Sequence, residues 1–125
     1  MSEEIPFERT TLTGLKYYIT QAGHGKNKPV KGEMVKVHYT GRFEDGEVFD
    51  TSQPTHAHPS SGTREPFEFK VGMGQVIAGW DEAIGDMVVG EKRTLTIPPN
   101  LGYGENPPPS IRRNAVLIFD VERMA

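Results

Sequence analysis

Hydrophobic and polar residues alternate along much of this chain, which is the pattern of β-strands with one buried face and one solvated face. The alternation is clearest in three segments, residues 15–20 (LKYYIT), 35–40 (VKVHYT) and 67–71 (FEFKV). Residues 115–119 (AVLIF) are apolar at every position, which indicates a central strand. Asp45-Gly46 lies between two further strand-like stretches and is a good hairpin turn signal. These features predict an antiparallel sheet with one face against a core.

One segment breaks this rhythm and has the spacing of a short helix. Its apolar residues recur at positions i, i+3, i+4 and i+7, namely Trp80, Ala83, Ile84 and Met87. The acidic residues 81 and 82 fall in the first turn, where the helix dipole favours negative charge. The chain therefore predicts an α+β domain, in which an antiparallel sheet has its apolar face covered by one short α-helix.

Length and composition are those of a single globular domain. The 125 residues are 35% hydrophobic and 25% charged. We expect residues 1–13, which are polar and weakly patterned, to be a partly mobile extension, and residues 14–125 to form the domain. The net charge of −3 gives no general attraction to nucleic acid. No apolar run is long enough to span a membrane, and a monomer is the default expectation.

The cysteine count narrows the chemistry and the compartment. The chain contains no cysteine, which excludes disulfides, thiolate metal sites and cysteine nucleophiles. This composition fits a reducing compartment, and the N-terminal Met-Ser-Glu-Glu lacks the basic and apolar regions of a secretory signal. We therefore expect a cytoplasmic protein.

Three short motifs place aromatic side chains beside one carboxylate and no nucleophile. They are VHYTGRFEDGEVFD (residues 37–50), VIAGWD (76–81) and LGYG (101–104). Aromatic walls without acid–base machinery suit a reaction that breaks no covalent bond, such as rotation about an X–Pro bond, whose barrier is ~18–20 kcal/mol. In the order and approximate spacing of these motifs, the chain resembles the FKBP family, the prolyl isomerases that bind tacrolimus and rapamycin. The resemblance runs from about residue 14 to residue 124.

The resemblance implies the FKBP fold, a curved antiparallel sheet wrapped around a single short helix. It also implies roles for individual residues. Those implied in catalysis are Trp80 as the floor under the prolyl ring, Tyr103 as a phenol that donates to a ligand carbonyl, and Asp50 as the carboxylate at the pocket edge. Those implied in binding substrate or inhibitor are Tyr39, Phe49, Phe67, Val76, Phe119 and, through its backbone N–H, Ile77. No cofactor and no metal are implied.

The function implied is a peptidyl-prolyl cis–trans isomerase that acts on X–Pro bonds in peptides and unfolded proteins. The resemblance further implies binding of tacrolimus and rapamycin, and a protein partner that is captured only together with the drug. The alternative is a non-catalytic module or chaperone that grips proline-containing partners with the same pocket. Domains of that kind usually lose the carboxylate, the phenol or the indole, whereas Asp50, Tyr103 and Trp80 are all present.

Several of these residues also have ordinary structural interpretations. Taken one at a time, Trp80, Tyr39 and Phe49 are more often plain core residues than binding residues. Asp50 is followed by hydroxyl residues, so a local turn or cap is its ordinary interpretation. Only the combined motifs favour a site.

Other motifs carry less weight. Gly72-Met73-Gly74 resembles the start of a dinucleotide-binding loop, but Ile77 occupies the third glycine position and no parallel βαβ unit follows. His56-Ala57-His58 has metal-ligand residues without an acidic or cysteine partner nearby, so a flexible polar loop is the preferred interpretation. By alternation, His38 falls on the wet face of its strand and is expected to be simply exposed.

Two segments depart from the family pattern. The connection at residues 51–65 (TSQPTHAHPSSGTRE) is longer than usual, and we expect it to bulge at the surface near the pocket edge, with Arg64 as a candidate partner for Asp50. The loop at residues 105–114 (ENPPPSIRRN) is shorter than usual and carries Arg112-Arg113 where two prolines commonly follow the isoleucine. In the family this loop overhangs the pocket, so we expect an intact floor and an altered roof.

Overall fold

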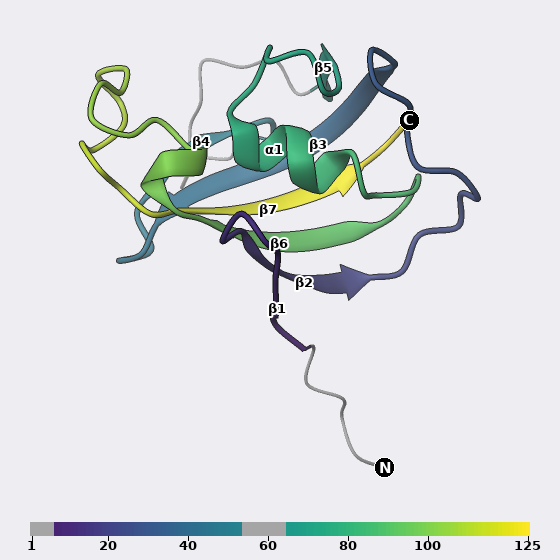
Figure 1. Ribbon diagram of the computed structural model, residues 1–125, viewed down its shortest axis with the longest axis horizontal. Helices are drawn as coiled ribbons and strands as arrows, with labels where there is room; N and C mark the ends of the chain where they lie inside the picture. Colours follow the sequence, from purple (N-terminus) through teal and green to yellow (C-terminus); the bar gives the residue numbers. More distant parts are fainter. Residues whose placement is uncertain (1–6, 54–64) are drawn as a thin grey trace.

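The computed structural model describes residues 7–53 and 65–125, which form an antiparallel sheet with one α-helix packed on it (Figure 1). The elements are β1 (Arg9–Thr10), β2 (Lys16–Gln21), β3 (Met34–Phe43), β4 (Val48–Thr51), β5 (Phe67–Lys70), α1 (Ala78–Ile84), β6 (Lys92–Ile97), the 3-10 helix η1 (Pro99–Leu101) and β7 (Leu117–Arg123). The described strands follow the order β1-β2-β6-β7-β3-β4, with β5 paired to β3, and every pairing is antiparallel. The predicted α+β fold is confirmed.

The middle of the sheet is the pair formed by β3 and β7. As predicted for its apolar segment, β7 is a central strand, and it lies between β6 and β3. It begins at Leu117 rather than at residue 115, because the N–H of Ala115 bonds to the carbonyl of Arg112 within the preceding loop. On β3, Val35 and Val37 are completely buried, as their alternation with polar neighbours predicts.

Helix α1 covers one face of the sheet and buries the predicted apolar stripe (Figure 1). Trp80, Ala83 and Ile84 are buried within the helix, and Met87, in the turn that follows it, is fully buried as well. Burying a side chain of the size of Ile84 or Met87 stabilises the fold by ~1.5–3 kcal/mol. The helix can lie this close to β6 because its second residue is a glycine, whose position leaves no room for a Cβ atom beside the sheet.

The carboxylate of Asp81 holds the loop that leads into α1. Its two oxygens accept hydrogen bonds from the backbone N–H of Gly72 at 2.8 Å and of Gly74 at 3.0 Å. Both glycines have a positive φ, 77° and 72° respectively, which glycine adopts without steric cost. Gly72 and Gly74 of the Gly72-Met73-Gly74 motif therefore form a turn that is hydrogen-bonded to a carboxylate of the helix.

The described part of the N-terminal extension is joined to the sheet. Strand β1 pairs with β2 and places Arg9 opposite Tyr17. The hydroxyl of Thr13 also donates to the carboxylate of Glu82 on α1. Residues 1–6 lie outside the described residues.

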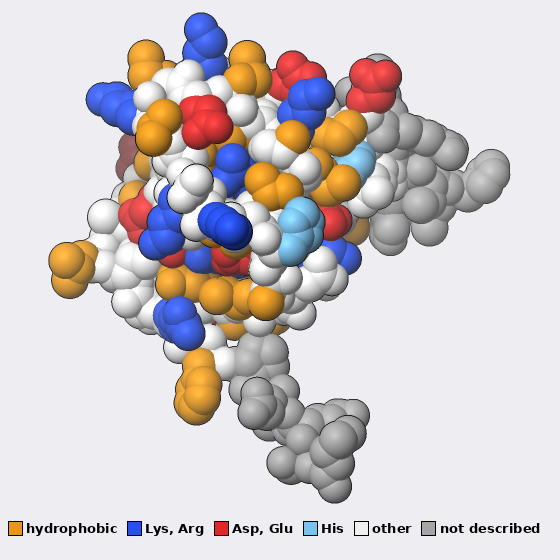
Figure 2. Space-filling model, turned by 90° about the vertical axis from the view of Figure 1, so that its right-hand side faces the viewer, with side chains coloured by type: hydrophobic (Ala, Val, Ile, Leu, Met, Phe, Trp, Pro, Cys, Tyr) orange, Lys and Arg blue, Asp and Glu red, His pale blue; other side chains and the backbone are white. Residues whose placement is uncertain are grey.

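The surface on the side where the chain ends carries charges of both signs. On this face, acidic side chains lie among the basic and hydrophobic ones (Figure 2), in keeping with a net charge of only −3. Within the described ranges, no helix is long and apolar enough to cross a membrane.

Gly41 lies where two aromatic side chains of the sheet meet. It is buried in β3, opposite Asp50 of β4 and Phe119 of β7. A Cβ atom at this position would lie 2.6 Å from ring atoms of both Phe49 and Phe119, which is closer than nonbonded atoms approach. Because that atom is absent, the two rings pack edge to face, with centroids 5.5 Å apart and an interplanar angle of 87°.

Substituting Gly41→Ala is expected to lower the free energy of unfolding by ~1–3 kcal/mol, the usual cost of overpacking a core, because one of the two rings must move. Urea denaturation measures this change. Lys26→Ala is the control, because this side chain is exposed and lies outside the packed rings. Equal losses in the two variants would contradict this account of the contact.

Candidate active site

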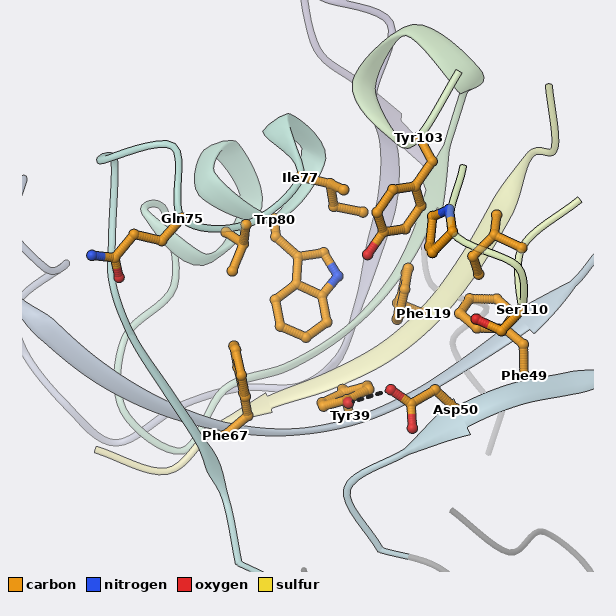
Figure 3. A pocket seen from close by; sticks show the side chains of 13 residues that line it. Tyr39, Phe49, Asp50, Phe67, Gln75, Ile77, Trp80, Tyr103, Ser110 and Phe119 are labelled. Atoms are coloured by element: carbon orange, nitrogen blue, oxygen red, sulfur yellow. Dashed lines mark hydrogen bonds between the residues drawn. The ribbon is translucent and has the colours of Figure 1, made fainter. Parts of the chain in front are cut away.

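A cavity of about 500 Å³ lies between α1, the sheet and the loop that follows η1 (Figure 3). Its lining consists of Tyr39, Phe49, Asp50, Phe67, Gln75, Val76, Ile77, Trp80, Tyr103, Pro108, Ser110, Ile111 and Phe119. Every residue that the sequence assigned to the site is in this set, although the residues come from four strands, the helix, the loop before it and the loop after η1. The structure thus brings the predicted residues together, and their individual roles stay predictions.

The floor of the cavity is the indole of Trp80, which is surrounded by other rings. Its ring centroid lies 5.0 Å from that of Tyr39, 5.2 Å from that of Phe119 and 6.1 Å from that of Phe67, at interplanar angles between 71° and 82°. Edge-to-face packing of this kind adds ~0.5–1.5 kcal/mol per pair beyond the burial of area. Because only 5% of Trp80 is exposed, the indole belongs to the core as well as to the cavity floor.

The N–H group of this indole has no acceptor among the described residues. Nε1 of Trp80 is buried and forms no hydrogen bond, and Figure 3 shows it on the side of the ring that faces Tyr103 and Phe119. A buried donor without a partner costs ~1–3 kcal/mol. The apolar floor therefore carries one unused donor.

Among the described residues, two donors hold the carboxylate of Asp50 at the edge of the cavity. The hydroxyl of Tyr39 donates to Oδ2 at 2.6 Å (Figure 3), and the backbone N–H of Thr51 donates to Oδ1 at 2.8 Å. Burial raises the pKa of the Tyr39 phenol well above its ordinary value, and the hydrogen bond and negative charge of Asp50 raise it further. The contact with its neighbour Thr51 and the contact across the hairpin coexist, and Asp50 is a residue of strand β4 that also lines the cavity.

Two candidate donors lie at the cavity, one on Tyr103 and one on the backbone of Ile77. The hydroxyl of Tyr103 points inward in Figure 3, and the pKa of this phenol is raised by burial and by the charge of Asp50. Ile77 is the N-cap of α1, where a backbone N–H has no partner within the helix. The N–H of Ile77 likewise makes no hydrogen bond to the residues described in the structure. A phenol hydroxyl and a backbone N–H without a partner are both able to donate to a carbonyl oxygen.

The loop after η1 forms the roof of the cavity. Pro108, Ser110 and Ile111 line the cavity from this loop, and Ile111 is 8% exposed. A hydrogen bond of 2.8 Å from the N–H of Asn114 to the carbonyl of Gly104 closes the base of the loop. Because these roof residues were predicted only as a segment, their individual positions come from the structure.

Gln75 is the lining residue that the sequence did not suggest. It lies at the far rim in Figure 3, where its side-chain oxygen accepts the N–H of Lys70 at 2.8 Å. The only signal for it is its place directly before the VIAGWD motif.

One expectation about a histidine is wrong. His38 was expected to be simply exposed, but it is half-buried, and its Nδ1 lies 2.9 Å from the hydroxyl of Ser52. The cause is β4, which ends in a turn that brings Ser52 against β3, where its hydroxyl also accepts the N–H of Tyr39.

Most of the long connection at residues 51–65 lies outside the residues that the structure describes. Residues 54–64 are outside the described residues, so the bulge near the pocket edge, the His56-Ala57-His58 motif and the pairing of Arg64 with Asp50 stay predictions. In the ranges that are described, no three histidine, cysteine, aspartate or glutamate residues are grouped as metal ligands.

The raised pKa of Tyr39 predicts a loss of stability at alkaline pH. The folded state favours the protonated phenol. The contribution of Tyr39 to the free energy of unfolding is therefore fully present below the ordinary phenol pKa of 10.0 and is lost as the pH rises further. We expect the free energy of unfolding to fall more steeply between about pH 9 and about pH 11 in the wild type than in Tyr39→Phe. Urea denaturation at each pH provides the two curves. Parallel curves would show that the phenol is not held in its protonated form by the fold.

Comparison with known proteins shows to which family the chain is similar. Residues 25–123 match the family model of the FKBP-type peptidyl-prolyl cis-trans isomerases. The chain is 44% identical over 110 residues to FK506-binding protein 1A of Aspergillus fumigatus, which covers 87% of this chain and 91% of that protein. It is 47% identical over 100 residues to peptidyl-prolyl cis-trans isomerase FKBP2 of Mus musculus, which covers 79% of this chain and 66% of that protein.

A solved structure gives the same result. The crystal structure of AtFKBP13 matches with a TM-score of 0.81 and 34% identity, over 95% of this chain and 98% of that one. The family match extends across all of the predicted site residues, from Tyr39 to Phe119. The resemblance seen in the motifs is therefore confirmed, and the chain belongs to the FKBP-type peptidyl-prolyl cis–trans isomerases.

Proposed function

We propose that this isomerase acts on X–Pro bonds in peptides and unfolded proteins by holding the bond in the aromatic cavity, and that the same cavity binds tacrolimus and rapamycin. The observation that carries the proposal is the convergence of the predicted residues on one cavity with Trp80 as its floor. The cavity volume of about 500 Å³ lies within the range of small-molecule sites, ~300–1,000 Å³.

The mechanism follows from what rotation does to the amide. The planar bond has a large dipole that water stabilises, and the twisted bond has a smaller dipole because conjugation is lost. A site that excludes water therefore disfavours the planar form more than the twisted form, which lowers the barrier by differential binding. Trp80, Tyr39 and Phe119 supply this environment, since their rings pack against one another at the cavity floor.

Fixed donors hold the substrate without solvating the rotating bond. The N–H of Ile77 and the hydroxyl of Tyr103 bind flanking carbonyl oxygens of the peptide. The carboxylate of Asp50 orients the Tyr39 hydroxyl through their 2.6 Å hydrogen bond and sets the local field. No proton transfer is needed, because no covalent bond breaks.

The same proposal covers the macrolide ligands and the partners of the protein. One relative is named for binding FK506, which is tacrolimus. A bound macrolide would leave part of its surface exposed at the mouth of the cavity, so a protein partner would recognise the drug and the roof together. In this proposal the chain acts as a monomer and lies in the cytoplasm. Its lack of cysteine fits the reducing conditions of that compartment. Neither nucleic acid nor a membrane is a partner.

The activity is tested by the exchange between cis and trans forms of a Leu-Pro-Phe peptide, followed by NMR with and without rapamycin. Uncatalysed exchange takes tens to hundreds of seconds, roughly. We expect the protein to accelerate it and one equivalent of rapamycin to abolish the acceleration. Binding of rapamycin without any acceleration would instead support the non-catalytic module.

Two substitutions test the residues separately. Trp80→Leu removes the floor and Asp50→Ala removes the edge carboxylate, and we expect each to lower kcat/KM by about tenfold or more, which corresponds to ~1.4 kcal/mol. Glu105→Gln, which changes an exposed carboxylate of the roof loop, is the control. Thermal unfolding of each variant confirms that it is folded. If Asp50→Ala changed neither activity nor rapamycin affinity, the role of Asp50 would be withdrawn.

A further inference from the structure

Arg112 joins the roof of the cavity to the β3–β4 hairpin. Its neighbour Ile111 lines the cavity, whereas the guanidinium of Arg112 reaches the turn of the hairpin. There Nη1 donates to Oδ2 of Asp45 at 2.9 Å, and Nη2 forms an ion pair with Glu47. The same guanidinium lies over the ring of Phe43, with Cζ 4.0 Å from the ring centroid. One cation thus makes three contacts with the hairpin.

The hairpin presents these three groups in a fixed arrangement. The N–H of Glu47 donates to Oδ1 of Asp45 at 2.9 Å, and the N–H of Phe43 donates to the carbonyl of Glu47 at 2.9 Å. The hydrogen bond from the backbone N–H of Glu47 and the guanidinium of Arg112 lower the pKa of Asp45 below its ordinary value. A planar guanidinium can bind two carboxylates and stack on a ring at once, which a lysine cannot.

The contact with Phe43 continues into the cavity wall. Phe43 is 4% exposed, and its ring centroid lies 4.9 Å from that of Phe49. Phe49 in turn packs edge to face on Phe119, and both line the cavity. The guanidinium therefore covers the outer end of a column of rings whose inner end is the wall of the site.

We propose that Arg112 is a positioning residue that clamps the roof of the cavity to the β3–β4 hairpin and so sets how closely the roof covers a bound X–Pro peptide. The two sides of the cavity joined by the clamp are the roof, with Ser110 and Ile111, and the wall formed by Phe49 and Asp50 on β4. This inference rests on the proposed function, in which the cavity is the isomerase site.

The size of the effect is limited by the exposure of the clamp. The side chains of Arg112, Asp45 and Glu47 are 49%, 56% and 64% exposed. Ion pairs in such positions are weak, and a cation–π contact at the surface is of similar strength. Together they can change peptide affinity by about 3- to 10-fold, which is large enough to measure and too small to decide whether the protein folds.

The matched pair of variants is Arg112→Ala and Arg113→Ala. Both remove one positive charge from the same loop, but Arg113 is exposed and forms no ion pair with the described residues. For the Leu-Pro-Phe peptide, we expect Arg112→Ala to raise KM by about 3- to 10-fold while kcat changes by less than about twofold, and Arg113→Ala to change neither. Glu47→Gln, which removes one partner of the clamp, should give a smaller rise in KM.

Amide hydrogen exchange tests the clamp independently of activity. The N–H of Ile111 bonds to the carbonyl of Pro108, and the N–H of Asn114 bonds to that of Gly104, both within the roof. We expect both amides to exchange faster in Arg112→Ala than in the wild type or in Arg113→Ala. High salt screens exposed ion pairs, so 1 M NaCl should raise KM of the wild type toward that of Arg112→Ala and leave the variant little changed.

The outcomes separate this inference from the proposed function. If the wild type does not accelerate exchange of the peptide, the proposed function fails, and amide exchange alone then decides whether the clamp exists. Equal amide exchange in Arg112→Ala and Arg113→Ala overturns the clamp in either case. Faster amide exchange with an unchanged KM would show a clamp that does not position the roof for substrate, which also overturns the proposal.

Discussion

The packing of one indole ring holds both the core and the cavity in place. Trp80 lies on the buried side of α1 and meets rings from β3, β5 and β7, so the helix and the sheet are joined at the same place where the site is formed. The floor cannot loosen without a loss of core packing. This coupling explains how a chain with only one seven-residue α-helix in its described part can hold the aromatic floor of a cavity in a fixed place.

The chemistry follows from that rigidity. Rotation of a prolyl bond requires a place where water is absent and the flanking carbonyl groups have fixed partners, rather than an acid, a base or a nucleophile. Asp50 is accordingly engaged by Tyr39 and Thr51 instead of being presented as a base. The floor and edge are built by the core, whereas the roof is a loop, which makes the roof the part of the site where this chain can differ from its relatives.

Sequence reasoning predicted strands at β2, β3, β4, β5 and β7, the turn at Asp45-Gly46 and the helical stripe, because each shows a local period or a turn residue, whereas β1 and β6 were not predicted. The cavity residues came from the resemblance, since alternation alone cannot tell a core ring from a binding ring. What escaped prediction depends on contacts between distant segments. The bonds of Asp81 to backbone N–H groups, the contact of His38 with Ser52 and the ion pairs of Arg112 with the hairpin all require the folded register, which no local pattern records.

The most direct test of this account is where the proline of a bound peptide lies. In an NMR titration with an X–Pro peptide, the ring protons of proline should move strongly upfield, because they lie over the face of Trp80, and they should show NOEs to the indole and to Phe119. Both effects should disappear when rapamycin is added. Accelerated exchange of a peptide whose proline protons stay unshifted and show no NOE to Trp80 would contradict the claim that the aromatic cavity is the catalytic site.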